Sequence, residues 1–307
     1  MNGIVIKSTG SWYAVRGETG QTIRCRIKGK FRTAGIKTTN PVAVGDEVEL
    51  ERTADDEGVI TRIKERKNYI IRKSTNLSKE THIIAANVDQ ALFVATVRHP
   101  ETSTVFMDRF LASAEAYGIP AVIVFNKIDL LDDEDLVLMR ALAAIYHQAG
   151  YTCLPVSAAT GEGIEAVAAT LAGKVSVLAG LSGTGKSTLI NRMEPGLLLK
   201  TAAISTAHDT GKHTTTFAEM FPLSAGGFIV DTPGIRAFGL VEVKKEELSR
   251  YFPEIFRASQ RCRFYNCTHI HEPGCAVIKA VEEGTISESR YASYASIFDE
   301  DEAKYRK

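Results

Sequence analysis

Residues 180–187 read Gly180-Leu-Ser-Gly-Thr-Gly-Lys-Ser187 and match G-x-x-x-x-G-K-[ST], the pattern of a phosphate-binding loop. The apolar run Val175–Ala179 before it predicts a strand, and a helical pattern runs from Ser187 to Met193. The motif needs this context because glycines let backbone amides surround phosphate oxygens and the helix N-terminus adds a positive dipole end. A chance Gly/Ser-rich turn is the alternative, and the flanking strand and helix argue against it. We expect a nucleotide to contact Gly180, Leu181, Ser182, Gly183, Thr184, Gly185, Lys186, Ser187 and Thr188.

A second motif, Asn126-Lys127-Ile128-Asp129, stands where a strand-like run ends and a loop begins. N-K-x-D at such a place resembles the guanine-reading motif of GTPases. A carboxylate at Asp129 would accept hydrogen bonds from guanine N1–H and the 2-amino group, whereas adenine offers a donor at neither position. That mismatch would cost about 1–3 kcal/mol. With Asn126 bracing the loop and the Lys127 stem covering the base, the expected ligand is GTP or GDP.

Two further stretches resemble parts of a GTPase site. Ser157-Ala158 follows the strand-like run Thr152–Val156 and resembles the turn whose backbone amide meets the guanine carbonyl. Asp231-Thr-Pro-Gly234 follows a short apolar run and resembles D-x-x-G. In that motif Asp231 would hold magnesium through water, and the Gly234 amide would contact the γ-phosphate.

Magnesium is the expected metal ion of this site. Ser187 would give its hydroxyl to the ion, while Lys186 neutralises the β- and γ-phosphate oxygens. The segment Ser205–Thr216 is rich in Thr, Gly and His and is typical of a switch loop. Any hydroxyl of Thr214–Thr216 could complete the ion's ligands, and Thr215 is the one we favour.

The residue directly after D-x-x-G is Ile235, where Ras-type GTPases carry the glutamine that orients the attacking water. Another group, or a partner, must therefore activate the water. His213 is our candidate, since an imidazole accepts a proton near neutral pH. The alternative is a surface histidine without a catalytic role, and Lys212 offers a further phosphate contact.

In this chain the two base-binding motifs come first, followed by the phosphate-binding loop and then the two switch motifs. In ordinary GTPases the phosphate-binding loop and the switch motifs come first, and the base-binding motifs follow. The order in this chain predicts a circular permutation of one α/β sheet, which neighbouring termini permit. Strand-like and helical runs alternate from about residue 82 to 240 and predict a mainly parallel sheet. The second switch then leads directly into the C-terminal region.

The first 70 residues predict a small closed β-barrel, for which the oligonucleotide-binding (OB) type is the leading candidate. Its expected strands are Gly3–Lys7, Trp12–Arg16, Gln21–Ile27, Asp46–Arg52 and Gly58–Ile63. Arg24 and Arg26 alternate with apolar neighbours, so these cations share one face. Trp12 either stacks on nucleic-acid bases or lies in the core. Glu65–Asn76 is predicted to be a connector.

Charge is distributed unevenly although the net charge is zero. Residues 1–40 contain eight lysines and arginines against one glutamate, a balance of +7, and the remainder therefore carries −7. A basic N-terminal region indicates either contact with a polyanion or an ordinary solvated face.

The spacing Cys262-x4-Cys267-x-His269-x5-Cys275 supplies three thiolates and one imidazole within fourteen residues. This is a complete tetrahedral ligand set, so we expect one structural zinc ion. The alternatives are a redox cluster and cysteines that are reduced by chance. His271 is the competing imidazole ligand.

Taken together, these motifs resemble the RsgA family of circularly permuted ribosome-assembly GTPases, and the resemblance covers essentially the whole chain. The Lys-His-Thr-Thr-Thr switch and the apolar residue after D-T-P-G also match. The resemblance implies GTP hydrolysis stimulated by the small ribosomal subunit, binding of its rRNA through the OB and zinc modules, and a late role in maturation of that subunit. A GTP-dependent RNA-binding switch with little turnover of its own and a GTP-dependent metallochaperone are the alternatives.

Length and composition fit a multidomain enzyme. A chain of 307 residues with 44% hydrophobic and 24% charged residues has the composition of globular proteins and is long enough for two or three domains. We expect domains at 1–70, 82–240 and 241–307, the last mainly helical. The absence of a long apolar run and the few, clustered cysteines predict a cytoplasmic protein without membrane contact. We also expect a monomer. Cys25 and Cys153 are expected in the core.

Overall fold

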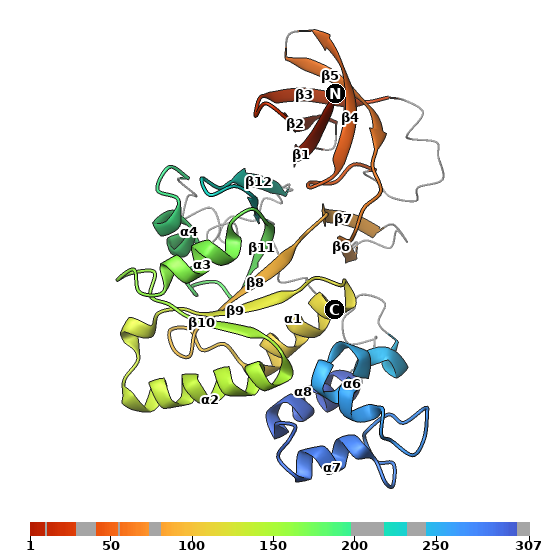
Figure 1. Ribbon diagram of the computed structural model, residues 1–307, viewed down its shortest axis with the longest axis vertical. Coiled ribbons are helices and arrows are strands. Elements are labelled where there is room, and N and C mark those ends of the chain that lie inside the picture. Colours follow the sequence, from red (N-terminus) through yellow and green to blue (C-terminus); the bar gives the residue numbers. More distant parts are fainter. Residues whose placement is uncertain are drawn as a thin grey trace, which may run out of the picture.

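The computed structural model describes residues 1–9, 11–28, 41–54, 56–73, 81–197, 218–231 and 244–299. Within them an N-terminal barrel, a central α/β part and a C-terminal group of helices follow one another (Figure 1). Eleven of the described strands form one continuous sheet, in the order β10-β9-β8-β11-β13-β12-β1-β2-β3-β5-β4. The barrel and the central part therefore share backbone hydrogen bonds.

The barrel consists of β1 (Asn2–Ser8), β2 (Tyr13–Gly17), β3 (Thr22–Ile27), β4 (Glu47–Ala54) and β5 (Glu57–Ile63). It closes because β1 pairs with β4 as well as with β2, and this confirms the five-stranded barrel. On β3, Ile23 and Cys25 are buried while Arg24 and Arg26 are exposed, as the alternation predicts. Trp12 is half-buried and lies outside the apolar barrel core, which takes Tyr13 instead.

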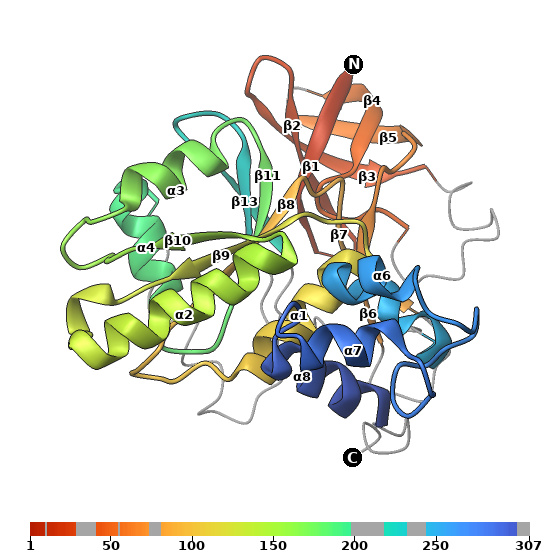
Figure 2. The same cartoon turned by 60° about the horizontal axis from the view of Figure 1, so that its bottom comes forward.

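The central sheet contains the parallel strands β8 (Gln90–Ala95), β9 (Ala121–Phe125), β10 (Thr152–Pro155), β11 (Val175–Ala179) and β13 (Phe228–Asp231), with β12 (Glu219–Pro222) antiparallel beside β13. Helices α1 (Thr104–Ala116) and α2 (Asp133–Ala149) cover one face, and α3 (Ile164–Leu171) and α4 (Lys186–Met193) the other (Figure 2). Successive residues of β8 point to opposite faces: Phe93 packs with the α1–α2 side and Val94 with the α3–α4 side. The alternation of strands and helices confirms the mainly parallel α/β sheet that the sequence predicts, while α3 and β12 were not anticipated from the sequence.

The predicted connector Glu65–Asn76 is wrong in part, because it contains a strand. β6 (Tyr69–Lys73) pairs antiparallel with β7 (Thr81–Ala86). Ile70 of β6 and Ala85 of β7 join the apolar core of the central part. Polar residues around Ile70 and Ile71 conceal the apolar pair in the sequence, so the segment looks like a loop.

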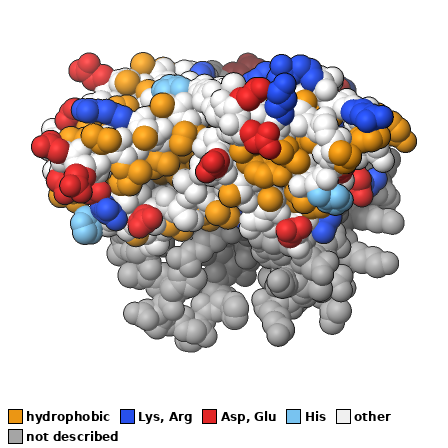
Figure 3. All heavy atoms as spheres, turned by 90° about the horizontal axis from the view of Figure 1, so that it is seen from below, with side chains coloured by type: hydrophobic (Ala, Val, Ile, Leu, Met, Phe, Trp, Pro, Cys, Tyr) orange, Lys and Arg blue, Asp and Glu red, His pale blue; other side chains and the backbone are white. Residues whose placement is uncertain are grey.

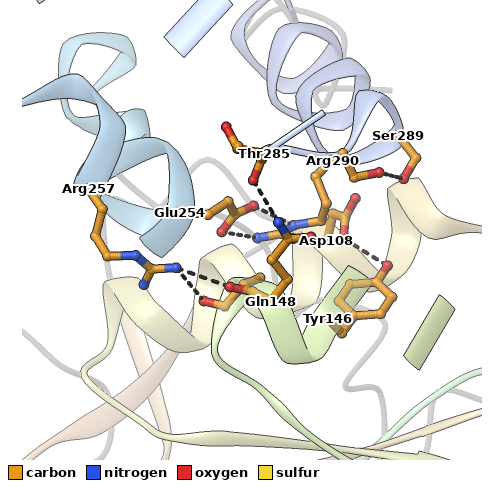
Figure 4. A network of polar contacts seen from close by, with 10 residues as sticks. Asp108, Tyr146, Gln148, Glu254, Arg257, Thr285, Ser289 and Arg290 are labelled. Carbon is orange, nitrogen blue, oxygen red and sulfur yellow. Dashed lines mark hydrogen bonds and ion pairs between the residues drawn. The ribbon is translucent and has the colours of Figure 1, made fainter. Parts of the chain in front are cut away.

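The C-terminal region contains a 3-10 helix, η4 (Lys245–Tyr251), and the helices α6 (Pro253–Ser259), α7 (Ala276–Glu282) and α8 (Glu288–Asp299). This confirms a mainly helical module, whose first helical segment is a 3-10 helix. Its core contains Phe252, Ile255 and Tyr294 and continues into α1 through Ala112. A buried polar network centred on Arg290 joins the same surfaces (Figure 4).

Seen from below, the molecule has apolar side chains across its face and acidic side chains at the left end (Figure 3). α2 starts at that end with Asp133, Glu134 and Asp135 after the N-cap Asp132. Carboxylates at a helix N-terminus are stabilised by its dipole. None of the described helices is long and apolar enough to cross a membrane.

Candidate nucleotide site and cysteine–histidine cluster

The phosphate-binding loop connects β11 to α4 and requires glycine at defined points. Gly180 and Gly185 have φ values of 137° and 89°, in the left-handed region that favours glycine. A Cβ at Gly180 would lie 2.2 Å from the Val94 carbonyl oxygen, and one at Gly185 would lie 2.4 Å from Asn126 Nδ2. The loop glycines therefore permit both its turns and its close approach to the base motif.

Lys186 and Thr184 hold the loop in a closed turn. Lys186 Nζ donates to the carbonyl oxygens of Gly180, at 3.0 Å, and Leu181, at 2.6 Å. Thr184 Oγ1 donates to the same Leu181 oxygen at 2.9 Å. The lysine charge is thereby kept inside the loop. Of the other expected contacts, Ser187 is buried in the first turn of α4, while Ser182, Gly183 and Thr188 are exposed.

Asn126 joins the three elements from which the sequence predicts a guanine site. Its side chain is buried, Nδ2 donates to the Thr184 carbonyl oxygen at 2.8 Å, and Oδ1 accepts from the Ala158 backbone N–H at 3.0 Å. The first bond reaches the phosphate loop, and the second reaches the Ser157-Ala158 turn. A single amide thus fixes the distance between the base-reading loops and the phosphate loop.

The rest of the base motif is less buried than Asn126. Lys127 has a left-handed backbone (φ 66°), and its Nζ donates to the His99 carbonyl oxygen at 2.5 Å. Ile128 and Asp129 belong to a short 3-10 turn, where Ser157 Oγ donates to Asp129 Oδ1 at 2.5 Å. Asp129 is exposed, so its carboxylate faces solvent at the rim of the site.

The second switch motif starts at the end of β13, next to the phosphate loop. β13 runs parallel to β11 with Val230 opposite Val177, so the backbone of Asp231 lies at the sheet edge where β11 leads into Gly180. The Asp231 side chain and the residues His213, Thr215 and Gly234 lie outside the part of the chain that the structure describes.

Three cysteines and a histidine converge in the C-terminal region. Ligand atoms of Cys262, Cys267, His269 and Cys275 all lie within 4.8 Å of one another. Cys262 Sγ and Cys275 Sγ are 3.9 Å apart and lie 3.6 and 3.5 Å from His269 Nδ1. Tetrahedral zinc with bonds of about 2.0–2.3 Å places neighbouring ligands roughly 3.5–3.8 Å apart. The cluster therefore fits a zinc site, whereas the competing His271 is exposed and outside the group.

A carboxylate and two tyrosines support this cluster. Glu272 accepts hydrogen bonds from Thr268 N and Oγ1, at 2.7 and 2.5 Å, and from two backbone amides at 3.2 and 3.3 Å. Burial raises the Glu272 pKa, but these bonds outweigh it and lower the pKa to about 2. From α8, Tyr291 and Tyr294 donate to the carbonyl oxygens of His269 and Thr268, both at 2.7 Å. Sequence reasoning missed these three residues, because their partners become apparent only in the fold.

Comparison with known proteins identifies the family. The family model of the RsgA N-terminal domain matches residues 2–60, and that of the RsgA GTPase matches residues 63–241. The chain belongs to the RsgA GTPase family. It is therefore a GTPase, and the sheet order and the two base loops preceding the phosphate loop are those of a circularly permuted member.

RsgA proteins are similar to this chain over nearly their full length. One from Bacteroides fragilis, named small ribosomal subunit biogenesis GTPase RsgA, is 56% identical over 100% of this chain and 99% of its own length. One of the same name from Christiangramia forsetii is 55% identical over 100% and 98%. The crystal structure of YjeQ from Thermotoga maritima superposes with a TM-score of 0.81 at 40% identity, covering 97% of this chain and 96% of that one. The structure of YloQ, a circularly permuted GTPase, gives 0.76 at 32% identity, with 100% and 96% covered.

Proposed function

We propose that this protein hydrolyses GTP during late maturation of the small ribosomal subunit, that it binds rRNA, and that the subunit stimulates its turnover. The observation that carries the nucleotide assignment is the Asn126 amide, which joins the base motif to the phosphate loop. The names of the relatives support the ribosomal assignment, since they are small ribosomal subunit biogenesis GTPases.

In the proposed site, guanine lies against Asn126–Asp129 and Ser157-Ala158, and the phosphates lie in the loop 180–188. Lys186 neutralises the β- and γ-oxygens, which is its task in phosphate-binding loops generally. Ser187 and Thr215 would hold magnesium directly, and Asp231 would hold it through water. The Gly234 amide contacts the γ-phosphate.

Water activation is proposed for His213, with a group of the ribosomal subunit as the alternative. Ile235 has no polar atom in its side chain and cannot orient water, so slow intrinsic hydrolysis is expected. This feature favours one second candidate, an RNA-binding GTP switch with little turnover of its own.

One structural zinc ion is proposed for Cys262, Cys267, His269 and Cys275. Four protein ligands leave no open position, so the ion would order the loop and take no part in catalysis. The loop between the first two cysteines supports an RNA contact, because Phe264 and Tyr265 are 41% and 103% exposed beside the exposed Arg261 and Arg263. A structural ion of this kind does not fit a metallochaperone, which must release its cargo.

The remaining proposals concern organisation and location. We divide the chain into an RNA-binding barrel (1–70), a GTPase domain (82–240) and a zinc-binding domain (241–307). We propose that it acts as a monomer in the cytoplasm, without membrane contact, on the small ribosomal subunit.

The testing experiment measures GTP hydrolysis with and without purified small ribosomal subunits, at several salt concentrations. We expect subunits to raise kcat, and rising salt to remove the stimulation steeply because phosphate contacts release counterions. Binding of subunits without any increase in turnover would support the RNA-binding switch instead. Neither binding nor stimulation would refute the ribosomal assignment.

A further inference from the structure

The outward side of α2 is apolar over its middle turns. Val137 and Leu138 are 63% and 45% exposed. Ala141 and Ala144 follow at spacings of three and four residues, which places them on the same side of the helix, and both are exposed. The opposite side of the helix contains the buried Tyr146 and packs into the core of the central part. We call Val137, Leu138, Ala141 and Ala144 the α2 face.

The α2 face belongs to a larger apolar surface of the molecule. α2 runs along the lower edge of the GTPase part in Figure 1, and the view from below shows apolar side chains across this surface (Figure 3). Leu130, at the end of the 3-10 turn η2 (Ile128–Leu130) just before the helix, adds another large apolar side chain that is 54% exposed. Single exposed apolar side chains are normal on protein surfaces, whereas neighbouring ones on one face indicate a contact surface.

An exposed valine is an unfavourable residue for a surface helix. A β-branched side chain loses freedom of rotation about χ1 in a helix, and Val137 gains no burial in return. Leu138 likewise leaves much of its side chain in water. A partner that covered both residues would gain the hydrophobic free energy that the chain alone leaves unused. The α2 face is therefore suited to a partner with apolar side chains.

Unneutralised acidic side chains adjoin the α2 face at the start of the helix. Of the four carboxylates there, Asp132 caps the helix and Asp135 forms an ion pair with Arg98 at 3.0 Å. Asp133 and Glu134 are exposed, and neither forms an ion pair with a lysine or arginine in the part of the chain that the structure describes. The surface thus combines apolar side chains with two negative charges that have no cationic partner there.

This combination determines the chemistry of the partner. Carboxylates repel the phosphates of nucleic acids and of anionic lipids, so RNA and membranes do not fit the acidic end. Complementary charge favours a partner with lysines or arginines beside its apolar side chains. Proteins that bind RNA are rich in these cations, so the protein components of the small ribosomal subunit have the required charge.

The length of the α2 face indicates a short partner segment. Val137 and Ala144 are seven residues apart at about 1.5 Å per residue, so the face is roughly 10 Å long. Two helical turns of a partner would cover it. Such a small contact is weak alone, but it adds to affinity when other parts of the same two molecules are already joined.

We propose that the α2 face docks a short basic segment of a protein of the small ribosomal subunit. Apolar side chains of that segment cover Val137 and Leu138, and its lysines or arginines pair with Asp133 and Glu134. The proposal rests on the proposed function, because the partner is a component of the subunit.

Photo-crosslinking tests what lies against the α2 face. The photoreactive amino acid p-benzoylphenylalanine replaces Leu138 or, as a control, the exposed Ala169 of α3, and each protein is illuminated with purified small ribosomal subunits. We expect the label at Leu138 to crosslink to a lysine- and arginine-rich peptide of a ribosomal protein, identified by mass spectrometry, that the control label does not reach. A crosslink to RNA, to a second copy of this chain or to the same peptide from both positions would overturn the proposal, as would no crosslink from Leu138.

Val137→Gln/Leu138→Gln tests the apolar contact. Glutamine is a good helix former, so the variant makes the α2 face polar without weakening the helix. The matched control is Ala166→Gln/Ala169→Gln, which changes two exposed positions of α3 on the other side of the sheet. We expect the first variant to lose about tenfold in affinity for subunits and the control to bind like wild type. Equal affinities of the two variants would overturn the proposal.

Asp133→Asn/Glu134→Gln tests the charge of the partner. Its control is Glu162→Gln/Glu165→Gln, which removes two exposed carboxylates at the start of α3. We expect the first variant to bind subunits more weakly than the control at low salt, with the difference shrinking as salt screens the charges. Tighter binding would show that RNA phosphates face this end, and unchanged binding would show that no cation does. Either result would overturn the proposal.

The two proposals fail in different ways. If the wild-type chain binds subunits and responds to them, and Val137→Gln/Leu138→Gln does so equally well, the α2 face is refuted and the proposed function stands. A wild-type chain that neither binds subunits nor responds to them would refute the proposed function itself. Basal GTP hydrolysis of all four variants should equal that of wild type, which shows that they are folded.

Discussion

Arg290 of α8 donates to Asp108 of α1 at 2.7 Å, and the two side chains are only 1% and 0% exposed (Figure 4). Arg290 also makes a two-pronged ion pair with Glu254 of α6, at 2.7 and 3.1 Å. Tyr146 of α2 donates to the same Asp108 oxygen at 2.9 Å, and burial beside this carboxylate raises the Tyr146 pKa, so the hydroxyl stays protonated. One guanidinium thus connects the C-terminal helices to the α1–α2 face of the GTPase sheet.

Arg290→Met is expected to destabilise the protein by about 3–5 kcal/mol, because it leaves two buried carboxylates without their cation. Urea unfolding followed by circular dichroism measures the loss. The control is Arg257→Ala, which removes an exposed arginine whose hydrogen bonds among the described residues go to the backbone oxygens of Gln148 and Ala149 in α2. Similar stability of the two variants would show that the buried network does not hold these parts together.

Asn126→Ala should weaken GTP binding because it removes contacts and also releases the phosphate loop and the base-reading loops from their fixed spacing. The variant leaves the Thr184 oxygen and the Ala158 amide without partners, and each unsatisfied buried group costs about 1–3 kcal/mol. We expect an affinity loss of about tenfold to a hundredfold in a fluorescent GTP titration. Gln148→Ala, on the exposed end of α2, serves as the control and should bind GTP normally.

Asp129→Asn tests the base specificity. An amide presents a donor where the carboxylate presents only acceptors, so it matches the C2 carbonyl of xanthine and mismatches the amino group of guanine. The variant should lose GTP affinity by at least about tenfold and gain affinity for xanthosine triphosphate. Competition between the two nucleotides measures the change. An unaltered preference for GTP would show that the guanine base does not contact Asp129.

His213→Ala tests water activation. General bases contribute about 10²–10⁴-fold, so subunit-stimulated kcat should fall within that range while GTP affinity stays nearly unchanged. His271→Ala is the control, since that exposed imidazole lies in the C-terminal region. Unchanged stimulated turnover in His213→Ala would show that a ribosomal group activates the water instead.

The sequence predicts features that depend on neighbouring residues, such as which side of a strand faces the core. It does not predict contacts between residues that are far apart in the chain. The alternation around Arg24 shows which side of β3 faces the core, because strand periodicity alone decides it. Arg290 carries no such signal, since its partner Asp108 lies 182 positions away in the chain. Asn126 was expected to brace its own loop, but its bond to Thr184 depends on how two loops meet at the sheet edge.

The hairpin β6–β7 was missed for a related reason. Ile70 and Ile71 are flanked by charged and polar residues, and the segment is a strand because Ile70 packs into the central core and Ile71 against a small cluster of Ala43, Ile83 and Ala86. Tertiary burial overrides the local preference there.

Glu272→Gln should weaken zinc retention without removing a ligand. The Glu272 carboxylate fixes the turn that carries His269 by accepting hydrogen bonds from Thr268 and two further amides, and such supporting groups alter metal affinity by about 10–100-fold. Zinc transfer from the purified protein to a colorimetric chelator measures the effect. Glu283→Gln, which removes a surface carboxylate paired with Lys279, is the matched control.

The Glu272 pKa sets the pH range over which the stability difference between wild type and Glu272→Gln stays constant. Its folded value of about 2 lies below the value of about 4.3 for an unfolded chain, so the carboxylate contributes stability above pH 4.3 and loses it as the pH falls toward 2. Between pH 5 and 8 the group is ionised in both states. The stability difference between wild type and Glu272→Gln, measured by thermal unfolding of the zinc-loaded protein, should therefore stay constant over that range. A difference that changes with pH there would mean that another titrating group controls the turn.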